Sequence, residues 1–229
     1  MRYRYSPLNS AAVKTESKRQ RAKAKTRHAL LKSALQLYSL EGRQGMTMNK
    51  VAKRAGIAQP SFYNHFDSLD SLQAELSEQL KTSYLSPMRQ AWVSMLTDFD
   101  SLNSLQFNQR CQQCLAMIFD SAFKNITLFQ RLIEDCPRLN SGNQDHTGLR
   151  GLIPDIQQEW AEIFIQGLRL SGRNVEISQV NLYVDIASAQ VHELILGCHL
   201  NRYTRKQAIL ILSTNFNNVF INLFIKNKK

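Results

Sequence analysis

The most informative stretch of the sequence is residues 46–66, MTMNKVAKRAGIAQPSFYNHF. It contains two short helical patterns, at residues 48–55 and 59–66, with Gly56 between them. Neither pattern is long enough to be stable as an isolated helix in water, so both must pack against a neighbour. Gly56 can adopt the positive φ that ends a helix, and Pro60 falls in a first helical turn, where its missing N–H is tolerated. The stretch therefore predicts a helix-turn-helix.

A longer helical pattern precedes this stretch and provides the neighbour that the two short helices need. It begins at Lys18 with a basic segment, and its second half carries apolar residues spaced three and four apart until about Gly42. These apolar residues are Leu30, Leu31, Ala34, Leu35 and Tyr38. Residues 18–66 are therefore predicted to form a three-helix head. Residues 1–17 show no apolar period and are predicted to be a flexible basic arm.

Positive charge is concentrated in this N-terminal part of the chain. Residues 1–66 contain 14 Lys or Arg and only two acidic residues, whereas the remaining residues are close to neutral and the whole chain carries a formal charge of +11. A field concentrated on one small unit implies a polyanionic partner, which double-stranded DNA would satisfy. An anionic membrane surface is the alternative, with the protein bound peripherally through its basic helix. It is the weaker alternative because the apolar stripe of that helix is needed to hold the two short helices.

A helix-turn-helix places its second helix in the major groove, where short polar side chains near the helix start meet base edges. Gln and Asn can pair with adenine through two hydrogen bonds, Ser can donate or accept, and a proline ring can touch a thymine methyl. The predicted base-contacting residues are Gln59, Pro60, Ser61 and Asn64. The residues predicted to contact phosphate are Lys25, on the basic helix, and Tyr63 and His65, on the flanks of the second short helix.

Residues 46–66 resemble the DNA-binding segment of TetR-family repressors, and their ending, FYNHF, is the most specific part of the likeness. The similarity covers residues 18 to about 80. It implies an all-helical homodimer with a three-helix DNA-binding head and a larger body that binds a small ligand and releases operator DNA. By position, the resemblance assigns base reading to Gln59, Pro60, Ser61 and Asn64, and phosphate binding to Tyr63 and His65. It also places four residues at the N-terminus of the helix that crosses the DNA backbone, namely Thr47, Met48, Asn49 and Lys50.

The chain departs from the TetR pattern at two positions. Ala58 stands where the family usually has a polar residue that opens the recognition helix, and the loss of a cap costs about 1 kcal/mol unless Gln59 takes over. Leu69 stands where the family commonly has a lysine that contacts phosphate. The missing lysine, together with the pairing of Gly-Ile-Ala with Ser-Phe-Tyr, is similar to repressors of unsaturated fatty acid synthesis of the FabR and DesT type.

The rest of the chain is predicted to be helical too, which makes the fold class all-α. The chain holds only nine Gly and five Pro, and no period-two strand pattern stands out. The expected helices cover residues 68–82, 87–98, 105–123, 125–135, 152–170, 179–200 and 205–226. Residues 137–151 form a long polar gap, which is expected to be a surface loop. Residues 67–229 are thus predicted to form one ligand-binding and dimerisation domain.

The last two predicted helices are apolar on more than one face. One face can belong to the core of the chain, and the other needs a further partner. A second copy of the chain, packed across a two-fold axis, would bury that face. The predicted dimer-interface residues are Tyr183, Ala187, Val191, Phe216 and Phe220. The alternative is a helix pair that is fully enclosed in a larger monomer.

Aromatic and methionine side chains gather between the head and these last helices. In the TetR family this region surrounds the effector, although side chains of this kind are more often plain core. The predicted ligand-binding residues are Trp92, Met95, Phe107, Met117, Phe123, Phe129, Trp160 and Phe164. Because the region is poor in charge, it favours a small apolar effector such as an acyl chain or an acyl thioester.

No pattern for catalysis, metal binding or a cofactor emerges. Cys111 and Cys114 lack the second pair that a zinc site needs, so they are expected to be structural, with thiol sensing as the alternative. His192 begins a His-Glu pair like that of zinc proteases but lacks a second histidine at the required spacing. There is no Ser-His-Asp ordering, phosphate loop or Gly-rich dinucleotide motif. The chain is therefore predicted to have no enzymatic activity.

The chain is expected to be cytoplasmic. It has only four Cys, without a disulfide framework, and its first twenty residues are polar and basic rather than a signal segment. No window holds eighteen uncharged apolar residues, the length that a membrane span requires. Secretion and membrane spanning are therefore disfavoured.

Overall fold

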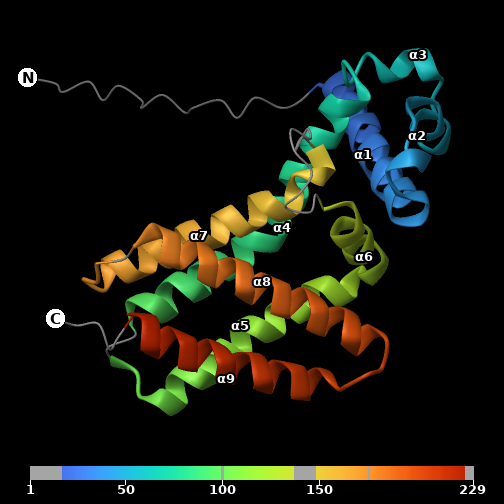
Figure 1. Ribbon diagram of the computed structural model, residues 1–229. Helices are drawn as coiled ribbons and strands as arrows, with labels where there is room; N and C mark the ends of the chain where they lie inside the picture. Colours follow the sequence, from blue (N-terminus) through green and yellow to red (C-terminus); the bar gives the residue numbers. More distant parts are fainter. Residues whose placement is uncertain (1–16, 99–100, 137–147, 175, 225–229) are drawn as a thin grey trace, which may run out of the picture.

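The computed structural model describes residues 17–98, 101–136, 148–174 and 176–224, with side chains for all of these except residues 87 and 220–224 (Figure 1). The described residues contain helices and no strand, which confirms the predicted all-α class. The elements are α1 (Lys18–Gly45), α2 (Met48–Arg54), α3 (Gln59–Phe62), α4 (Leu69–Thr97), α5 (Ser104–Lys124), α6 (Ile126–Asp135), the 3-10 turn η2 (Gly148–Arg150), α7 (Leu152–Leu170), α8 (Ile177–His199) and α9 (Arg205–Phe224). Helices α1 to α3 form a head at one end of the molecule, and α4 runs from this head into a body built by the remaining helices (Figure 1).

The head contains three helices, as the sequence predicts, but α3 ends at Phe62 and residues 63–65 form a turn, so the predicted helix over residues 59–66 is too long. Gly42 and Gly56 adopt φ of +68° and +75°, which interrupts α1 after its apolar stripe and turns the chain after α2. Thr47 caps α2 because its side chain accepts a hydrogen bond from the Lys50 amide. The three helices enclose a core of fully buried side chains, which are Leu30, Ala34, Val51, Ala52 and Phe62.

Helix α4 corrects the prediction of two helices over residues 68–82 and 87–98, because it is one continuous helix. Ser68 caps its start by accepting a hydrogen bond from the Ser71 amide. A mid-helix proline such as Pro87 costs about 3 kcal/mol. Eight buried apolar side chains that pack mainly against α7 and η2 outweigh this cost, at about 1.5 to 3 kcal/mol each. They are Leu72, Leu76, Leu80, Leu85, Met88, Trp92, Met95 and Leu96.

The predicted surface loop at residues 137–151 also needs correction at its C-terminal end. Residues 137–147 lie outside the described residues, but residues 148–150 form η2, which packs against α4. Leu149 is only 2% exposed, and a Cβ at Gly148 would lie 3.0 Å from Cβ of Gln73. The two leucines of residues 137–151 lie ten positions apart among polar residues and form no helical or strand period, so the sequence pattern carries no sign of this contact.

The buried apolar residues form two clusters. One lies in the body, among α4, α5, α7, α8 and α9. The other, which we call the head core, joins the head to α4, α6, η2 and the start of α7; it includes Leu30, Tyr38, Leu132, Leu149 and Leu152. The head is therefore packed on the body, and the predicted division at residue 67 is not a break in the hydrophobic packing.

Candidate nucleic-acid interface and internal cavity

Residues 59–66, which we call the recognition segment, present the predicted base-contacting residues at the surface. Gln59, Pro60 and Asn64 are exposed, and Ser61 is half-buried. Ala58 stands at the N-cap of α3, and no side chain caps the helix in its place, as the sequence indicates. The inner face of this short helix is buried in the head. The structure thus brings the four residues together on one short segment, with their polar groups accessible.

The residues predicted to open α2 lie at the surface as well. Thr47, Asn49 and Lys50 are exposed, and Met48 is half-buried. The Thr47 hydroxyl accepts the Lys50 amide hydrogen at 3.3 Å, and the Lys50 ammonium pairs with Glu41 of α1. Exposed pairs of this kind contribute about 0 to 1 kcal/mol. Lys50 can therefore exchange the carboxylate for a phosphate at little cost.

Arg27 of α1 is a structural residue that the sequence reasoning missed. Its guanidinium donates to the backbone carbonyl of His65, lies 4.0 Å from the centre of the Phe66 ring and pairs with Glu75 of α4. One side chain thus ties α1 to the end of the recognition segment and to α4. In the sequence Arg27 is one more member of a basic run, so no local signal distinguishes it.

The two flanking residues of the recognition segment differ in their surroundings. Tyr63 is 52% exposed. Burial lowers the pKa of His65, and the nearby Lys23 and Arg27 lower it further, so the imidazole is neutral at neutral pH. Its Nδ1 is buried and has no hydrogen-bond partner among the described residues. A neutral imidazole can hold a phosphate oxygen by donating a hydrogen bond, but not as a cation.

The first half of α1 keeps its basic side chains in solvent. They are Lys18, Arg19, Arg21, Lys23 and Lys25, all exposed. None of them forms an ion pair with the part of the chain that the structure describes, in contrast to Arg27 and Lys50. Uncompensated positive charge therefore lies on the same helix that contacts the recognition segment, which is the arrangement that favours a phosphate backbone.

Residues 30–76, from α1 into α4, match the sequence profile of bacterial regulatory proteins of the tetR family. The chain carries a TetR-family DNA-binding domain. The HTH-type transcriptional regulator RutR of Escherichia coli K12 is 29% identical over 82 residues, which are 36% of this chain and 39% of RutR. An HTH-type transcriptional regulator of Haemophilus influenzae is 39% identical over 70 residues, 30% of this chain and 34% of that protein. The chain thus matches well under half of the length of these curated relatives.

Solved TetR-family structures share the fold over most of the chain. A regulator from Streptomyces coelicolor has a TM-score of 0.59 at 17% identity, with 87% of this chain and 82% of that one covered. The fatty acid degradation regulator FadR from Bacillus halodurans has a TM-score of 0.54 at 14% identity, with 91% and 97% covered. At these identities the likeness shows the fold alone, a TetR head on a helical body. The profile match confirms the TetR-type DNA-binding segment that residues 46–66 predict, and the solved structures show that the rest of the chain shares the fold of these regulators.

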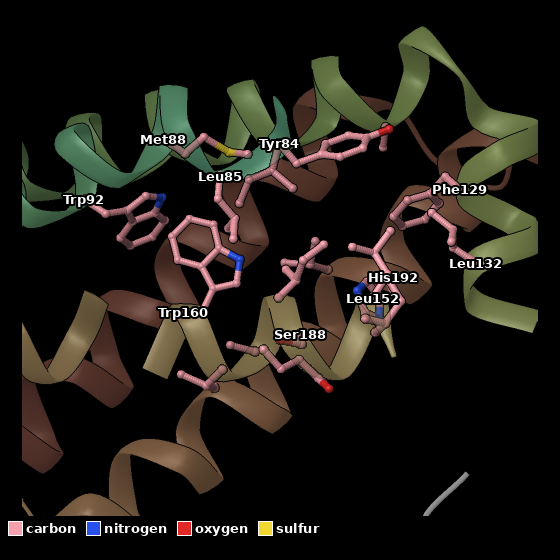
Figure 2. A pocket seen from close by; sticks show the side chains of 18 of the residues that line it. Tyr84, Leu85, Met88, Trp92, Phe129, Leu132, Leu152, Trp160, Ser188 and His192 are labelled. Atoms are coloured by element: carbon pink, nitrogen blue, oxygen red, sulfur yellow. The ribbon is translucent and has the colours of Figure 1, made fainter. Parts of the chain in front are cut away.

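The helical body contains a cavity of about 120 Å³ (Figure 2). Four of the predicted ligand-binding residues line it, namely Trp92, Phe129, Trp160 and Phe164. The other lining residues are Tyr84, Leu85, Met88, Ile118, Ala122, Leu132, Leu152, Ile153, Ile156, Gln157, Val184, Ala187, Ser188, Val191, His192 and Phe216. Among these described residues there is no Asp, Glu, Lys or Arg. The cavity lining thus lacks charged side chains, as expected from the low charge of this region of the sequence.

The other four predicted ligand-binding residues do not line this cavity. Met95 and Phe107 are buried in the core of the body, and Met117 packs half-buried against that core. Phe123 instead borders an open hollow beside the turn between α8 and α9. Helical spacing alone could not separate these residues from the lining ones, because it does not specify which apolar face of α5 meets the cavity.

The polar side chains at the cavity were not among the predicted ligand-binding residues. Tyr84, Gln157, Ser188 and His192 line it, and none of these side chains forms a hydrogen bond within the described part of the chain. Burial lowers the pKa of His192 to about 4, so this histidine is neutral at neutral pH. Its ring meets that of Phe129 edge to face, with the centroids 5.8 Å apart. The available signal was the spacing of four between Ser188 and His192, which places both on one face of α8.

The predicted dimer residues lie mostly beneath the surface of a single chain. Tyr183, Val191 and Phe216 are 5%, 8% and 7% exposed, but Tyr183 and Phe216, with Ala187, line a groove between α8 and α9. Ala187 is half-buried, and the side chain of Phe220 lies outside the described residues. The large apolar residues that α8 and α9 do expose are Ile177, Leu182, Ile186, Leu210, Ile211 and Val219. The exposed residues Leu182, Ile186 and Val219 line the same groove, and sequence reasoning did not include them.

The remaining candidate sites carry no sign of separate chemistry. Burial raises the pKa of the Cys111 thiol to about 12 and that of Cys114 to about 11, which keeps both protonated. Across residues 17–224, as far as they are described, no group of three or more His, Cys, Asp or Glu could hold a metal ion. Within the same residues, no helix is both long and apolar enough to cross a membrane.

Proposed function

We propose that the chain is a DNA-binding transcriptional regulator that binds its operator as a homodimer and responds to a small apolar effector. The observation that carries the proposal is that Gln59 and Asn64 are exposed, with the half-buried Ser61 between them, on a TetR-type helix-turn-helix beside the basic half of α1. In this role the protein acts in the cytoplasm, where it represses transcription by occupying promoter DNA. The assignments of Lys25, Tyr63 and His65 to phosphate belong to the same proposal.

The exposed apolar residues of α8 and α9 support the homodimer. Leu182, Ile186 and Val219 are 61%, 52% and 39% exposed, and all three border one shallow groove between the two helices. An exposed apolar surface of this kind is what a second copy, packed across a two-fold axis, would bury. Two heads held by this contact would enter successive major grooves of a pseudo-palindrome, about 34 Å apart.

The shared lining of the cavity and the head core supports a route from effector to DNA. Leu132, Leu152 and Ile153 line the cavity and also belong to the head core. On the same side, the Tyr38 hydroxyl of α1 donates to Oδ2 of Asp135 in α6 at 2.8 Å. A ligand that displaces α6 or the start of α7 would therefore change the orientation of the head. Coupling of this kind is typically worth about 1 to 3 kcal/mol.

An acyl chain is the effector we propose, in keeping with the resemblance to fatty-acid repressors. The apolar lining would receive a hydrocarbon chain, and the FadR structure with the same fold is that of a fatty acid degradation regulator. The cavity of about 120 Å³ is smaller than the engineered cavity of about 150 Å³ that holds one benzene ring, so a longer chain would have to open it further.

The test compares an operator fragment with random DNA. Asn64→Ala should weaken operator binding by about 1 to 3 kcal/mol and leave random DNA almost unaffected, because Asn64 is proposed to read a base edge. Lys25→Ala is the matched control and should weaken binding to both DNAs alike, with the salt slope reduced by about one unit. Fluorescence anisotropy over a range of salt concentrations measures both effects. Equal losses on the two DNAs for Asn64→Ala would reject base reading. Sedimentation with anionic liposomes and no binding to either DNA would favour the membrane alternative.

A further inference from the structure

We infer that the cavity takes an uncharged ligand with two unlike ends, one polar and oriented by Ser188 and His192, the other apolar and held between Trp92 and Trp160. This inference rests on the proposed function in treating the cavity as the effector site, and it specifies the chemical class of the effector. Figure 2 shows the two tryptophans at one end of the cavity and His192 with Phe129 at the other.

The apolar end is formed by packed aromatic rings. The centroid of the Trp92 ring lies 5.6 Å from that of Trp160 and 5.4 Å from that of Phe164. Met88 lies beside them on α4 and also lines the cavity (Figure 2). Rings and a thioether offer a ligand extensive apolar contact and adapt to its shape. This end therefore suits a hydrocarbon or a ring.

The polar end is formed by side chains that are left without partners. Ser188 and His192 lie one turn apart on α8, and Tyr84 and Gln157 line the same cavity from α4 and α7. All four side chains are half-buried, so a ligand that enters the cavity covers their polar groups and must supply hydrogen bonds to them. A neutral imidazole and a hydroxyl can each donate and accept, so a ligand hydroxyl, carbonyl or ester would satisfy them.

The surroundings of the cavity disfavour an anion. None of the described lining residues is a cation, and the charged residues next to Met88 and Trp160 in the sequence, Arg89 and Glu159, pair with each other. Burial also keeps His192 neutral, since its pKa lies near 4. A carboxylate in this cavity would lose its hydration without gaining a counter-charge. The effector is therefore an alcohol, ester, ketone or amide and not a free carboxylic acid.

The experiment uses the full-length protein and its own tryptophan fluorescence. Trp92 and Trp160 are the two tryptophans of the chain, and both line the cavity, so their emission reports occupancy. The probes are cyclohexylmethanol, cyclohexanecarboxylate and cyclohexane, which differ in the polar group. They share one ring that is larger than benzene, so each must open the cavity of about 120 Å³ to a similar extent. At pH 7.5 cyclohexylmethanol should bind at least roughly tenfold more tightly than the carboxylate.

Two histidine variants separate polar recognition from packing. His192→Leu should weaken cyclohexylmethanol about fivefold and leave cyclohexane within about twofold, because only the alcohol loses a hydrogen bond. His199→Leu, on the same helix but outside the lining, is the matched control and should change neither affinity. If His192→Leu leaves the preference for the alcohol intact, the polar end is wrongly assigned.

The result that would overturn the inference is a carboxylate that binds as tightly as the alcohol, or the absence of any fluorescence change with all three probes. Operator binding, measured without probe on the same sample, tests the proposed function separately. A protein that binds operator and fails with the probes keeps its function and loses this ligand class. A protein that binds the alcohol and no DNA keeps the ligand class and loses the function.

Discussion

At the scale of single residues, burial determines the chemistry of the titratable groups in the body. His192 resembles a fragment of a zinc motif in the sequence, and Cys111 and Cys114 resemble half of one. In the folded chain burial lowers the pKa of the histidine and raises those of the two thiols, so all three are neutral at neutral pH. The two thiols are therefore weak nucleophiles at neutral pH, and the imidazole of His192 is available as an uncharged hydrogen-bonding group.

The pKa of His192 predicts a pH-dependent contribution to stability. Its folded value of about 4 lies below the ordinary 6.5, so the unfolded chain binds the proton more readily. The contribution is therefore fully present above pH 6.5 and is lost as the pH falls towards 4, by up to about 3 kcal/mol. Urea unfolding at pH 7.5 and pH 4.5 measures it, and His192→Leu should lose less stability between these values than the wild type. Identical losses in the two proteins would mean that His192 is not neutral in the folded state.

At the scale of helices, contacts between distant elements join the head to the body. Helix α4 runs through both because its buried stripe continues past residue 87. Helix α1 contacts α6, where Tyr38, only 1% exposed, donates to Asp135. Burial and the Asp135 carboxylate raise the pKa of the Tyr38 hydroxyl, which therefore stays a donor. The head orientation thus depends on α6 as well as on α4.

The link between α1 and α6 can be tested by removing one oxygen atom. Tyr38→Phe should lower the free energy of unfolding by about 1 kcal/mol, because the hydrogen bond to Asp135 is lost while the ring remains buried. It should also reduce the effect of bound cyclohexylmethanol on operator affinity. Asp135→Asn keeps an acceptor oxygen and should cost less stability. Denaturant unfolding and fluorescence anisotropy provide the two measurements, and unchanged values in both would exclude a coupling role for this bond.

At the scale of the whole molecule, the two clusters of buried residues support different parts of the proposed function. The head core positions the recognition segment, and the body cluster surrounds most of the cavity and supports the outer face of α8 and α9. Phe216 and Ala187 border both the cavity and the outer groove. The proposed effector site and the proposed dimer face are therefore separated by a single layer of side chains.

The proposed dimer face makes a prediction for the assembly. Ile186→Asp places a charge on the exposed side of α8 and should yield monomers, which bind a two-site operator poorly because the second half-site is lost. Leu40→Asp is the control, since Leu40 is 61% exposed on α1, in the head. Analytical ultracentrifugation distinguishes the states. A dimeric Ile186→Asp protein would place the interface elsewhere.

The sequence by itself determined the all-α class, the helix-turn-helix and the basic half of α1, because these depend on local patterns. Periodicity located α5 to α9 to within about three residues, and residues 46–66 indicated the family. Only the tertiary structure decided which apolar faces meet. Trp92 and Trp160 line the cavity while Met95 and Phe107 are core, and the inner face of α8 differs from the outer one although both are apolar. Helical spacing shows that an apolar helix face must be buried. It does not show which helix buries that face, because the partner lies far away in the sequence.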